Sequence, residues 1–488
     1  MKSLPAAFLF LSFFLFFAPS ANAQFISSEQ VFPVEGYSVF EMGYPLKVTR
    51  AGQGNFAFLE FWAEGKQGRR IGNYYLQAYG INDYVEHWFK PVTNEGFEPM
   101  QITDLIKLEK CFAVIGKQYQ SKSKGYQTVA RFFGLEGKPF ADEPVSLSIF
   151  PKANRSQNEW TVHSPKRKYL AWVGADGEDT YLTLWGNYGG QQTEKTLQLP
   201  YSDQKYEIDQ VLVNDEGEVF FLSRYTRSGT EAQPLVLNKY LPEEERFITT
   251  LINTALGKKT ELLNMSFSFE QEILITGALS GPGGNGISNG AKIGRGDISV
   301  ITDIFCQRYT NTKDEITLAA DSISPLPEKW TKYFAEQGGS NFSEVKIVSA
   351  RDGLALLWEE CYEAKKRFYC YRLGVLGLDP ETGGLSWNRL IAKKQRDNSD
   401  QFLSYVSGVN QGKLRLVYLS ERGARGNLMC ISIDLKSGER RDKILASNET
   451  AEYLIFPRSS AEVSGREMVL VGMGNPSQNN YKLITITF

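Results

Sequence analysis

The sequence predicts an all-β fold, an eight-bladed β-propeller, on three observations. First, a turn rich in Gly, Asp, Asn or Pro followed by a short, mostly apolar run recurs along the chain. Second, most copies lie roughly 50 to 60 residues apart, close to propeller repeats of about 40–50 residues plus loops. Third, aromatic residues make up 13% of the chain and 44 residues are glycine, which fits strands joined by tight turns. If one unit is misread, seven blades is the alternative.

Each copy of the pattern anchors one unit of four short strands. The copies begin at Gln53, Glu109, Pro165, Asp215, Glu270, Asp352, Gln411 and Ser464. Short strands with turns at close, regular spacing are typical of all-β proteins. Length alone would suggest three domains of about 150 residues each. Blades form one continuous fold, however, so we expect a single domain over residues 24–488.

The third and fourth units illustrate the four-stranded pattern. The strands predicted for the third unit are 159–163, 168–173, 180–185 and 193–199. Those predicted for the fourth are 206–213, 219–222, 234–240 and 246–251. The last unit lacks a fourth strand, since the chain stops at Phe488. We expect the N-terminal stretch Pro33–Phe40 to complete that blade and close the ring, which protects sheet edges.

Two segments depart from the strand pattern. A connector helix is predicted over Pro327–Gln337, with Pro in the first turn and Gly338-Gly339 just past the end. The glycine-dense stretch 279–296 predicts a long flexible loop at the rim. Its glycines match G-x-G-x-x-G, but a dinucleotide site needs a helix directly after that motif. More Gly and Asn follow instead, so we expect no such site.

The first 23 residues are interpreted as a signal peptide. Lys2 carries a positive charge, Ala6–Ala18 is apolar, and Ala21-Asn22-Ala23 is an A-x-A cleavage site. No later segment reaches the about 20 apolar residues of a transmembrane helix. We therefore expect an exported protein, periplasmic or extracellular, without a membrane span.

The five cysteines suggest one disulfide. An odd count in an exported protein leaves at least one thiol outside a bridge. Strands over 356–363 and 367–373 flank a turn near Lys365-Lys366, which sets Cys361 opposite Cys370. A two-residue loop would put this pair at a non-hydrogen-bonded position, where side chains lie closest. The alternatives are a four-residue loop, which suits a disulfide less well, and two buried thiols.

Few residues point to catalysis. The charge is balanced at −2, which gives no electrostatic reason to expect nucleic-acid binding, since such binding usually leaves a basic stripe. With two histidines, His87 and His163, a zinc site is not expected. Glu359 and Glu360 are adjacent on a strand and should point to opposite faces, so they cannot act as a pair.

Two charged turns remain open to binding. The acidic group Asp176, Glu178 and Asp179 offers oxygen ligands for calcium, or is a solvated hairpin turn. The basic group Lys166, Arg167 and Lys168 could contact an anionic ligand, or is a solvated turn.

Segment 163–172, HSPKRKYLAW, resembles the blade start of TolB-type and WD-repeat-like propellers, Ser-Pro-Asp-Gly-Lys-x-Leu-Ala-Phe. It departs from that pattern at Lys166-Arg167, where the family has Asp-Gly. The region of roughly 260 to 420 is similar to a group of uncharacterised exported proteins from Bacteroidetes. The matching residues are 352–360, 383–387, 391–395, 403–405, Gly277 and Asp297-Ile298. The resemblance implies a propeller in a Gram-negative exported location and brings no site residues with it.

Segment 378–387, LDPETGGLSW, resembles the tryptophan-docking motif of quinoprotein propellers, with a fragment at 434–438. Its role there is structural, since a polar turn places a Trp between neighbouring blades. The ligands of a quinone cofactor are not found, so we expect no cofactor and no metal. The most consistent function is a non-catalytic binding or scaffolding propeller with a protein or glycan ligand. The alternative is a glycosidase with carboxylates in the central funnel.

Overall fold

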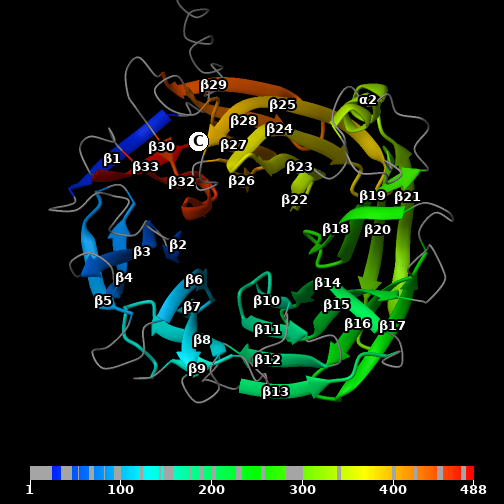
Figure 1. The fold of residues 1–488 in the computed structure, drawn as a ribbon, viewed down its shortest axis with the longest axis horizontal. Helices are drawn as coiled ribbons and strands as arrows, with labels where there is room; N and C mark the ends of the chain where they lie inside the picture. Colours follow the sequence, from blue (N-terminus) through cyan, green and yellow to red (C-terminus); the bar gives the residue numbers. More distant parts are fainter. Residues whose placement is uncertain are drawn as a thin grey trace, which may run out of the picture.

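The computed structural model describes residues 25–488 apart from the ranges listed next. They are 34–46, 53, 65–70, 82, 93–99, 121–124, 142–143, 148–157, 176–178, 187–191, 201–204, 227–233, 254–258, 282–299, 338–341, 398–402, 422–425, 448–453 and 474–479. The predicted signal peptide lies outside the described residues. Within the described ranges, the strands form eight antiparallel sheets arranged as blades of a ring around a central opening (Figure 1). The predicted eight-bladed propeller is therefore confirmed.

The first four blades each contain four consecutive strands. Blade 1 has β2 (Lys47–Gly52), β3 (Asn55–Glu64), β4 (Ile71–Gly80) and β5 (Glu86–Pro91). Blade 2 has β6 (Met100–Lys107), β7 (Cys111–Gln120), β8 (Gly125–Gly134) and β9 (Val145–Ser146). Blade 3 has β10 (Asn158–His163), β11 (Tyr169–Ala175), β12 (Thr180–Gly186) and β13 (Gln192–Leu197). Blade 4 has β14 (Lys205–Val213), β15 (Val219–Thr226), β16 (Leu235–Leu241) and β17 (Arg246–Ile252).

Blades 5 to 7 follow the same order, and blade 8 combines both ends of the chain. Blade 5 has β18 (Lys259–Phe267), β19 (Ile273–Gly281), β20 (Val300–Asn311) and β21 (Ile316–Pro325). Blade 6 has β22 (Phe342–Ala350), β23 (Gly353–Ala364), β24 (Arg367–Leu378) and β25 (Leu385–Asp397). Blade 7 has β26 (Val406–Asn410), β27 (Lys413–Leu419), β28 (Leu428–Asp434) and β29 (Arg440–Ala446). Blade 8 has β30 (Leu454–Ile455), β31 (Ala461–Ser464), β32 (Glu467–Met473), β33 (Asn480–Thr487) and β1 (Phe25–Pro33).

The N-terminal strand closes the ring, but it lies upstream of the predicted stretch. β1 pairs antiparallel with β33, from Phe25 opposite Thr487 to Pro33 opposite Asn480. Of the predicted stretch Pro33–Phe40 only Pro33 belongs to this strand, and residues 34–40 lie outside the described residues. Proline has no N–H to donate and suits an edge or end of a strand. Pro33 therefore ends the closing strand instead of beginning it.

Hydrophobic cores lie between the blades. Among the described residues, one apolar cluster fills each of the eight junctions between neighbouring blades. At the junction of blades 2 and 3, for example, the rings of Phe132 and Trp185 stack with centroids 4.0 Å apart. Because a blade is covered on both faces, its two middle strands are apolar at successive positions. This explains the recurring apolar runs in the sequence.

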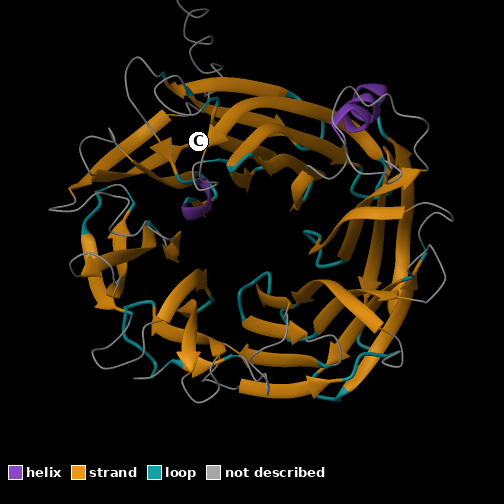
Figure 2. Ribbon diagram, viewed as in Figure 1, coloured by secondary structure: helices purple, strands orange, loops and turns teal. Residues whose placement is uncertain are grey.

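The predicted helix is confirmed as α2 (Glu328–Gln337), at the outer side of the ring near blades 5 and 6 (Figure 2). Trp330 is 1% exposed and packs edge-to-face on Trp358 of blade 6. The side chains of Tyr333 and Phe334 lie outside the described residues. Among the described residues, no helix is long and apolar enough to cross a membrane.

The predicted flexible loop begins later than the sequence indicated. β19 extends to Gly281, with Leu279 opposite Asp303 and Ser280 opposite Ile301. Leu279 and Ser280 are buried in the sheet. Pairing with β20 therefore keeps them in a strand, although glycine-rich sequence follows directly. The remaining positions of the glycine-dense stretch lie outside the described residues.

Two details of blade 6 bear on the cysteine and tryptophan predictions. Lys365 and Lys366 form a two-residue turn with φ of 52° and 59°, and Cys361 lies opposite Cys370. The two are joined by a disulfide with Cα atoms 4.3 Å apart. Trp387 donates from Nε1 to the Leu435 carbonyl oxygen of blade 7 at 3.1 Å. The tryptophan therefore docks between neighbouring blades, on the fragment 434–438.

Candidate functional site

The first turn of blades 3, 4 and 5 has one shared local structure. The residue that begins the turn has a side-chain oxygen that accepts hydrogen bonds from backbone N–H groups two to five residues later. These first residues are Ser164, Asn214 and Ser268. The fourth residue has positive φ; these residues are Arg167, Gly217 and Gln271. Because every blade runs in the same direction, its first and third turns lie on the same face of the ring. Side chains of neighbouring turns can therefore meet there.

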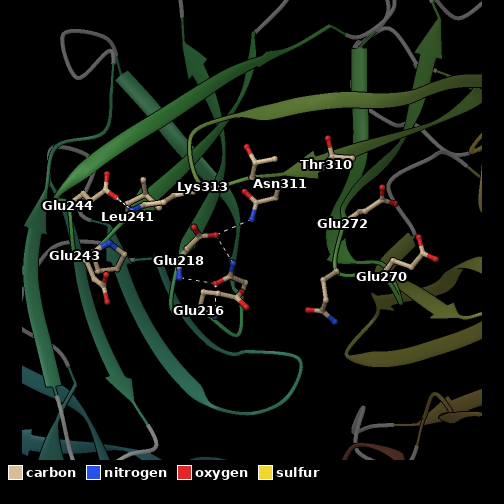
Figure 3. A pocket seen from close by; sticks show the side chains of 14 residues that line it. Glu216, Glu218, Leu241, Glu243, Glu244, Glu270, Glu272, Thr310, Asn311 and Lys313 are labelled. Carbon is tan, nitrogen blue, oxygen red and sulfur yellow. Dashed lines mark hydrogen bonds and ion pairs between the residues drawn. The ribbon is translucent and has the colours of Figure 1, made fainter.

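A pocket of about 730 Å³ opens on this face between blades 4 and 5 (Figure 3). It is bounded by the first and third turns of both blades. Its lining comprises Asn214, Glu216, Glu218, Leu241, Pro242, Glu243, Glu244, Glu270, Gln271, Glu272, Thr310, Asn311, Thr312 and Lys313. Six of these residues are glutamates, and no aromatic ring lines the pocket.

Glu218 forms a fixed part of the pocket wall. Its side chain is 13% exposed and pairs with Lys239, whose side chain is fully buried, at 2.7 Å. The other carboxylate oxygen accepts from Asn214 Nδ2 at 2.6 Å and Asn311 Nδ2 at 3.0 Å. Lys239 also donates to the Thr312 carbonyl oxygen at 2.8 Å. A buried charge persists only when paired and hydrogen-bonded, and this network supplies both and ties blade 4 to blade 5.

Two further glutamates are also committed to basic partners. Glu244 contacts Lys313 at 2.7 Å and Arg246 at 2.5 Å, and these hydrogen bonds lower the pKa of Glu244 to about 2. Glu272 forms an ion pair with Arg308 at 3.3 Å. Glu244 and Glu272 are thus already neutralised.

Three glutamates of the pocket keep their charge uncommitted. Glu216, Glu243 and Glu270 are exposed, and no basic side chain among the described residues pairs with them. Figure 3 displays them on separate turns around the opening. The arrangement can therefore bind a positively charged group that enters between the two blades.

Carboxylates of the inner strands are engaged in contacts between and within blades. Asp104 on β6 pairs with Lys47 on β2. Glu159 on β10 accepts from Lys117 and from Thr128 of blade 2. Asp209 on β14 accepts two hydrogen bonds from Arg224 Nε, at 2.8 and 3.0 Å. These three carboxylates are therefore engaged with basic or hydroxyl side chains of the ring.

The residues singled out from the sequence lie apart from the pocket. His87 Nε2 is 3.1 Å from Asn55 Oδ1, and His163 Nδ1 is 2.9 Å from the Ser164 carbonyl oxygen. Glu359 and Glu360 are neighbours on β23, and both lie in the part of that strand that is buried throughout. Glu359 binds Lys393 and Ser404. Within the acidic turn, Asp176 and Glu178 lie outside the described residues, while Asp179 accepts from Tyr181 at 3.4 Å.

Sequence analysis missed the pocket glutamates. Each belongs to a short turn that reads as a solvated loop by itself, such as 214–218, 242–245 or 268–272. A local signal exists in retrospect, since these three turns together carry seven glutamates. These turns come together only because the ring places blades 4 and 5 side by side.

No protein-family model and no curated protein matches the sequence. Solved structures that match include WD40- and TolB-type propellers and the structures of several peptidases. The chain is similar to the Dos1 propeller, with 10% identity, a TM-score of 0.46, and 94% of this chain and 95% of that chain covered. It is similar to the WD40 domain of SCAP from fission yeast, with 9% identity, a TM-score of 0.44, and coverage of 94% and 98%. It is also similar to TolB from Acinetobacter baumannii, with 10% identity and a TM-score of 0.29. That match covers 79% of this chain and 79% of that chain.

Proposed function

We propose that this propeller is an exported binding or scaffolding protein of the bacterial envelope that captures a cationic protein segment in the pocket between blades 4 and 5. The observation that carries the proposal is the charge state of the pocket wall. Three of its glutamates are neutralised by Lys239, Lys313 and Arg308. The other three face the opening without a basic partner among the described residues.

The chemistry of the wall favours a Lys- or Arg-bearing protein segment over a glycan. Carboxylates at the rim attract cationic groups and steer their approach. The Glu218–Lys239 pair and its amide neighbours hold the wall before the ligand arrives, which lowers the entropic cost of binding. Glycan and enzyme functions remain as outcomes of the test.

Export is part of the proposal and rests on the sequence of the first 23 residues. The Cys361–Cys370 disulfide supports it, because disulfides persist in oxidising compartments. Expression of the full-length chain in a Gram-negative host, followed by fractionation and N-terminal sequencing, tests this part. A cytoplasmic protein that retains Met1 would contradict it.

The binding test is a calorimetric titration of the mature protein with a short lysine-rich peptide at low salt. The variant combines Glu216→Gln, Glu243→Gln and Glu270→Gln. We expect its affinity to fall by about tenfold, since three exposed charge contacts of about 0.5 kcal/mol each are lost together. Added salt should weaken wild-type binding more than variant binding.

The matched control removes the same charge from other turns on the same face. It combines Asp352→Asn, Glu381→Gln and Glu439→Gln, all of which are exposed. Equal losses in variant and control, or no binding by the wild-type protein, would overturn the proposed pocket. Turnover of a glycan panel that resists both sets of changes would favour the glycosidase alternative.

A further inference from the structure

Basic residues gather at the inner rim of blades 1 to 3, on the same face as the acidic pocket. Arg50 lies on β2 opposite Phe56, and Lys107 lies on β6 opposite Phe112. Both precede the first turn of their blade, and Arg167 lies within the first turn of blade 3. The innermost strands of these blades, β2, β6 and β10, border the central opening in Figure 1. The three residues therefore lie at or beside the first turns of three successive blades, on one face of the ring.

Contacts between blades 2 and 3 fix the position of Arg167. Its guanidinium donates from Nη1 to the Lys107 carbonyl oxygen at 2.8 Å. Its own carbonyl oxygen accepts the Glu109 N–H, also at 2.8 Å. Its φ is 63°, in the region where Gly217 stands in the equivalent turn of blade 4. Gln271 of blade 5 has a similar φ of 67°, so the left-handed angle belongs to the shared turn.

The described carboxylates near this trio act on it only through space, Glu109 on Lys107 and Glu462 on Arg50. Lys107 Nζ donates to the carbonyl oxygens of Leu108 and Glu109, at 2.7 and 3.3 Å. Within the described part of the chain, no carboxylate forms an ion pair with Arg50, Lys107 or Arg167. The neighbouring carboxylate Asp104 is already paired with Lys47.

The three positive charges of Arg50, Lys107 and Arg167 repel one another. Burial and then the charge of Arg167, with a smaller contribution from Arg50, lower the pKa of Lys107, while nearby Cys111 and Glu109 raise it. Burial and then the charge of Arg50 lower the pKa of Arg167. An anion placed among the three groups would relieve this repulsion.

We propose that Arg50, Lys107 and Arg167 form a binding site for a phosphate group where the innermost strands of blades 1 to 3 meet their first turns. Guanidinium groups bind phosphate oxygens in pairs, and an ammonium adds a compact point charge. Three cations match a doubly charged phosphate better than a singly charged carboxylate. The site uses blades 1 to 3, whereas the acidic pocket uses blades 4 and 5, so neither depends on the other.

The test titrates the mature protein with inorganic phosphate, a hexose phosphate and acetate, followed by calorimetry. The main variant is Arg167→Gly, because glycine adopts the positive φ without strain and the turn should remain folded. We expect its phosphate affinity to fall by about tenfold or more. Arg50→Gln should produce a loss in the same direction. Tighter binding of the hexose phosphate than of phosphate would identify a phosphorylated sugar as the source.

The matched control is Lys166→Gln, which removes one exposed charge from the same turn. Its phosphate affinity should equal that of the wild-type protein. If Lys166→Gln and Arg167→Gly lose phosphate affinity equally, the effect comes from the overall charge of the turn, and the proposed site is wrong. So would acetate binding as tightly as phosphate, or no phosphate binding at about 10 mM. Retained binding of the lysine-rich peptide by Arg167→Gly would separate this site from the acidic pocket.

Discussion

Two fully buried lysine side chains are tolerated because each has a specific partner. Lys239 and Lys393 have fully buried side chains, and each pairs with a glutamate, Glu218 and Glu359 respectively. Ser404 donates a second hydrogen bond to Glu359. Removing one partner of a buried pair leaves an uncompensated charge and is more damaging than replacing both. Each pair lies within one blade, and further hydrogen bonds to Thr312 and Ser404 connect that blade to the next part of the chain. The pairs are therefore poor candidates for ligand contacts.

The five cysteines divide into two chemical classes. Cys361 and Cys370 share the disulfide, while Cys111, Cys306 and Cys430 are buried thiols. Burial raises the pKa of each of these three thiols to about 12. Because the thiolate is the reactive form and these groups stay protonated well above neutral pH, they should be inert in the folded protein.

We therefore predict the result of thiol counting on mature protein without reductant. At pH 8 the folded protein should react with no equivalents of Ellman's reagent, and the denatured protein with three. Reduction before denaturation should raise the count to five. Five reactive thiols without reductant, in protein purified from its native compartment, would contradict the disulfide.

Among the elements, the hairpins and turns carry most of the local information. The turn at Lys365-Lys366 decides the register of β23 and β24, and the register decides that Cys361 meets Cys370. The polar turn at Asp379 is held by three hydrogen bonds to its carboxylate, from Glu381 N, Thr382 N and Thr382 Oγ1. It leads into β25, which carries Trp387 to its dock on blade 7.

The docking of Trp387 makes a specific demand on Gly377. A Cβ atom at Gly377 would lie 1.9 Å from the Trp387 ring. Gly377→Ala should therefore force the ring to move and lower the free energy of unfolding by about 1–3 kcal/mol, the usual cost of overpacking. Urea denaturation followed by tryptophan fluorescence measures this change.

Gly52→Ala provides the comparison for that measurement. A Cβ at Gly52 meets nothing within 4 Å, so its free energy of unfolding should stay near the wild-type value. If the two variants unfold at the same urea concentration, Trp387 is not confined as the structure places it.

At the scale of the whole molecule, ring closure is the decisive event. β1 covers the edge of β33 and so joins the first described strand to the last. An open ring would expose a strand edge, and exposed edges pair with other chains. The cores at the junctions of blade 8 also depend on this sheet, because Val469 and Leu470 face different neighbours.

Deleting residues 25–33 should accordingly lower the thermal midpoint and promote self-association. Thermal unfolding and light scattering after size-exclusion chromatography measure the two effects. Removal of residues 1–24 alone, which corresponds to cleavage of the predicted signal peptide with one further residue, serves as the control and should remain monodisperse. A 25–33 deletion that behaves like this control would mean that β1 does not close the ring.

The repeated blade can be predicted from the sequence, because each strand, turn and hairpin depends on neighbours within one unit. The strands predicted for the third and fourth units agree with β10–β17 to within a few residues at their ends, and α2 follows its Pro and Gly signals. The same locality set the apposition of Cys361 and Cys370. The closing strand and the start of the glycine-dense loop were misplaced, because pairing with β33 and β20 decides those boundaries.

Which distant polar groups meet depends on how the blades pack around the ring. Glu218 and Asn311 are 93 residues apart, and Arg167 and Lys107 are 60 residues apart, yet both pairs are in hydrogen-bond contact. No local pattern encodes such contacts, because they arise when separate blades are packed around one axis. The acidic pocket and the basic trio therefore became visible only once the ring placed their turns on one face.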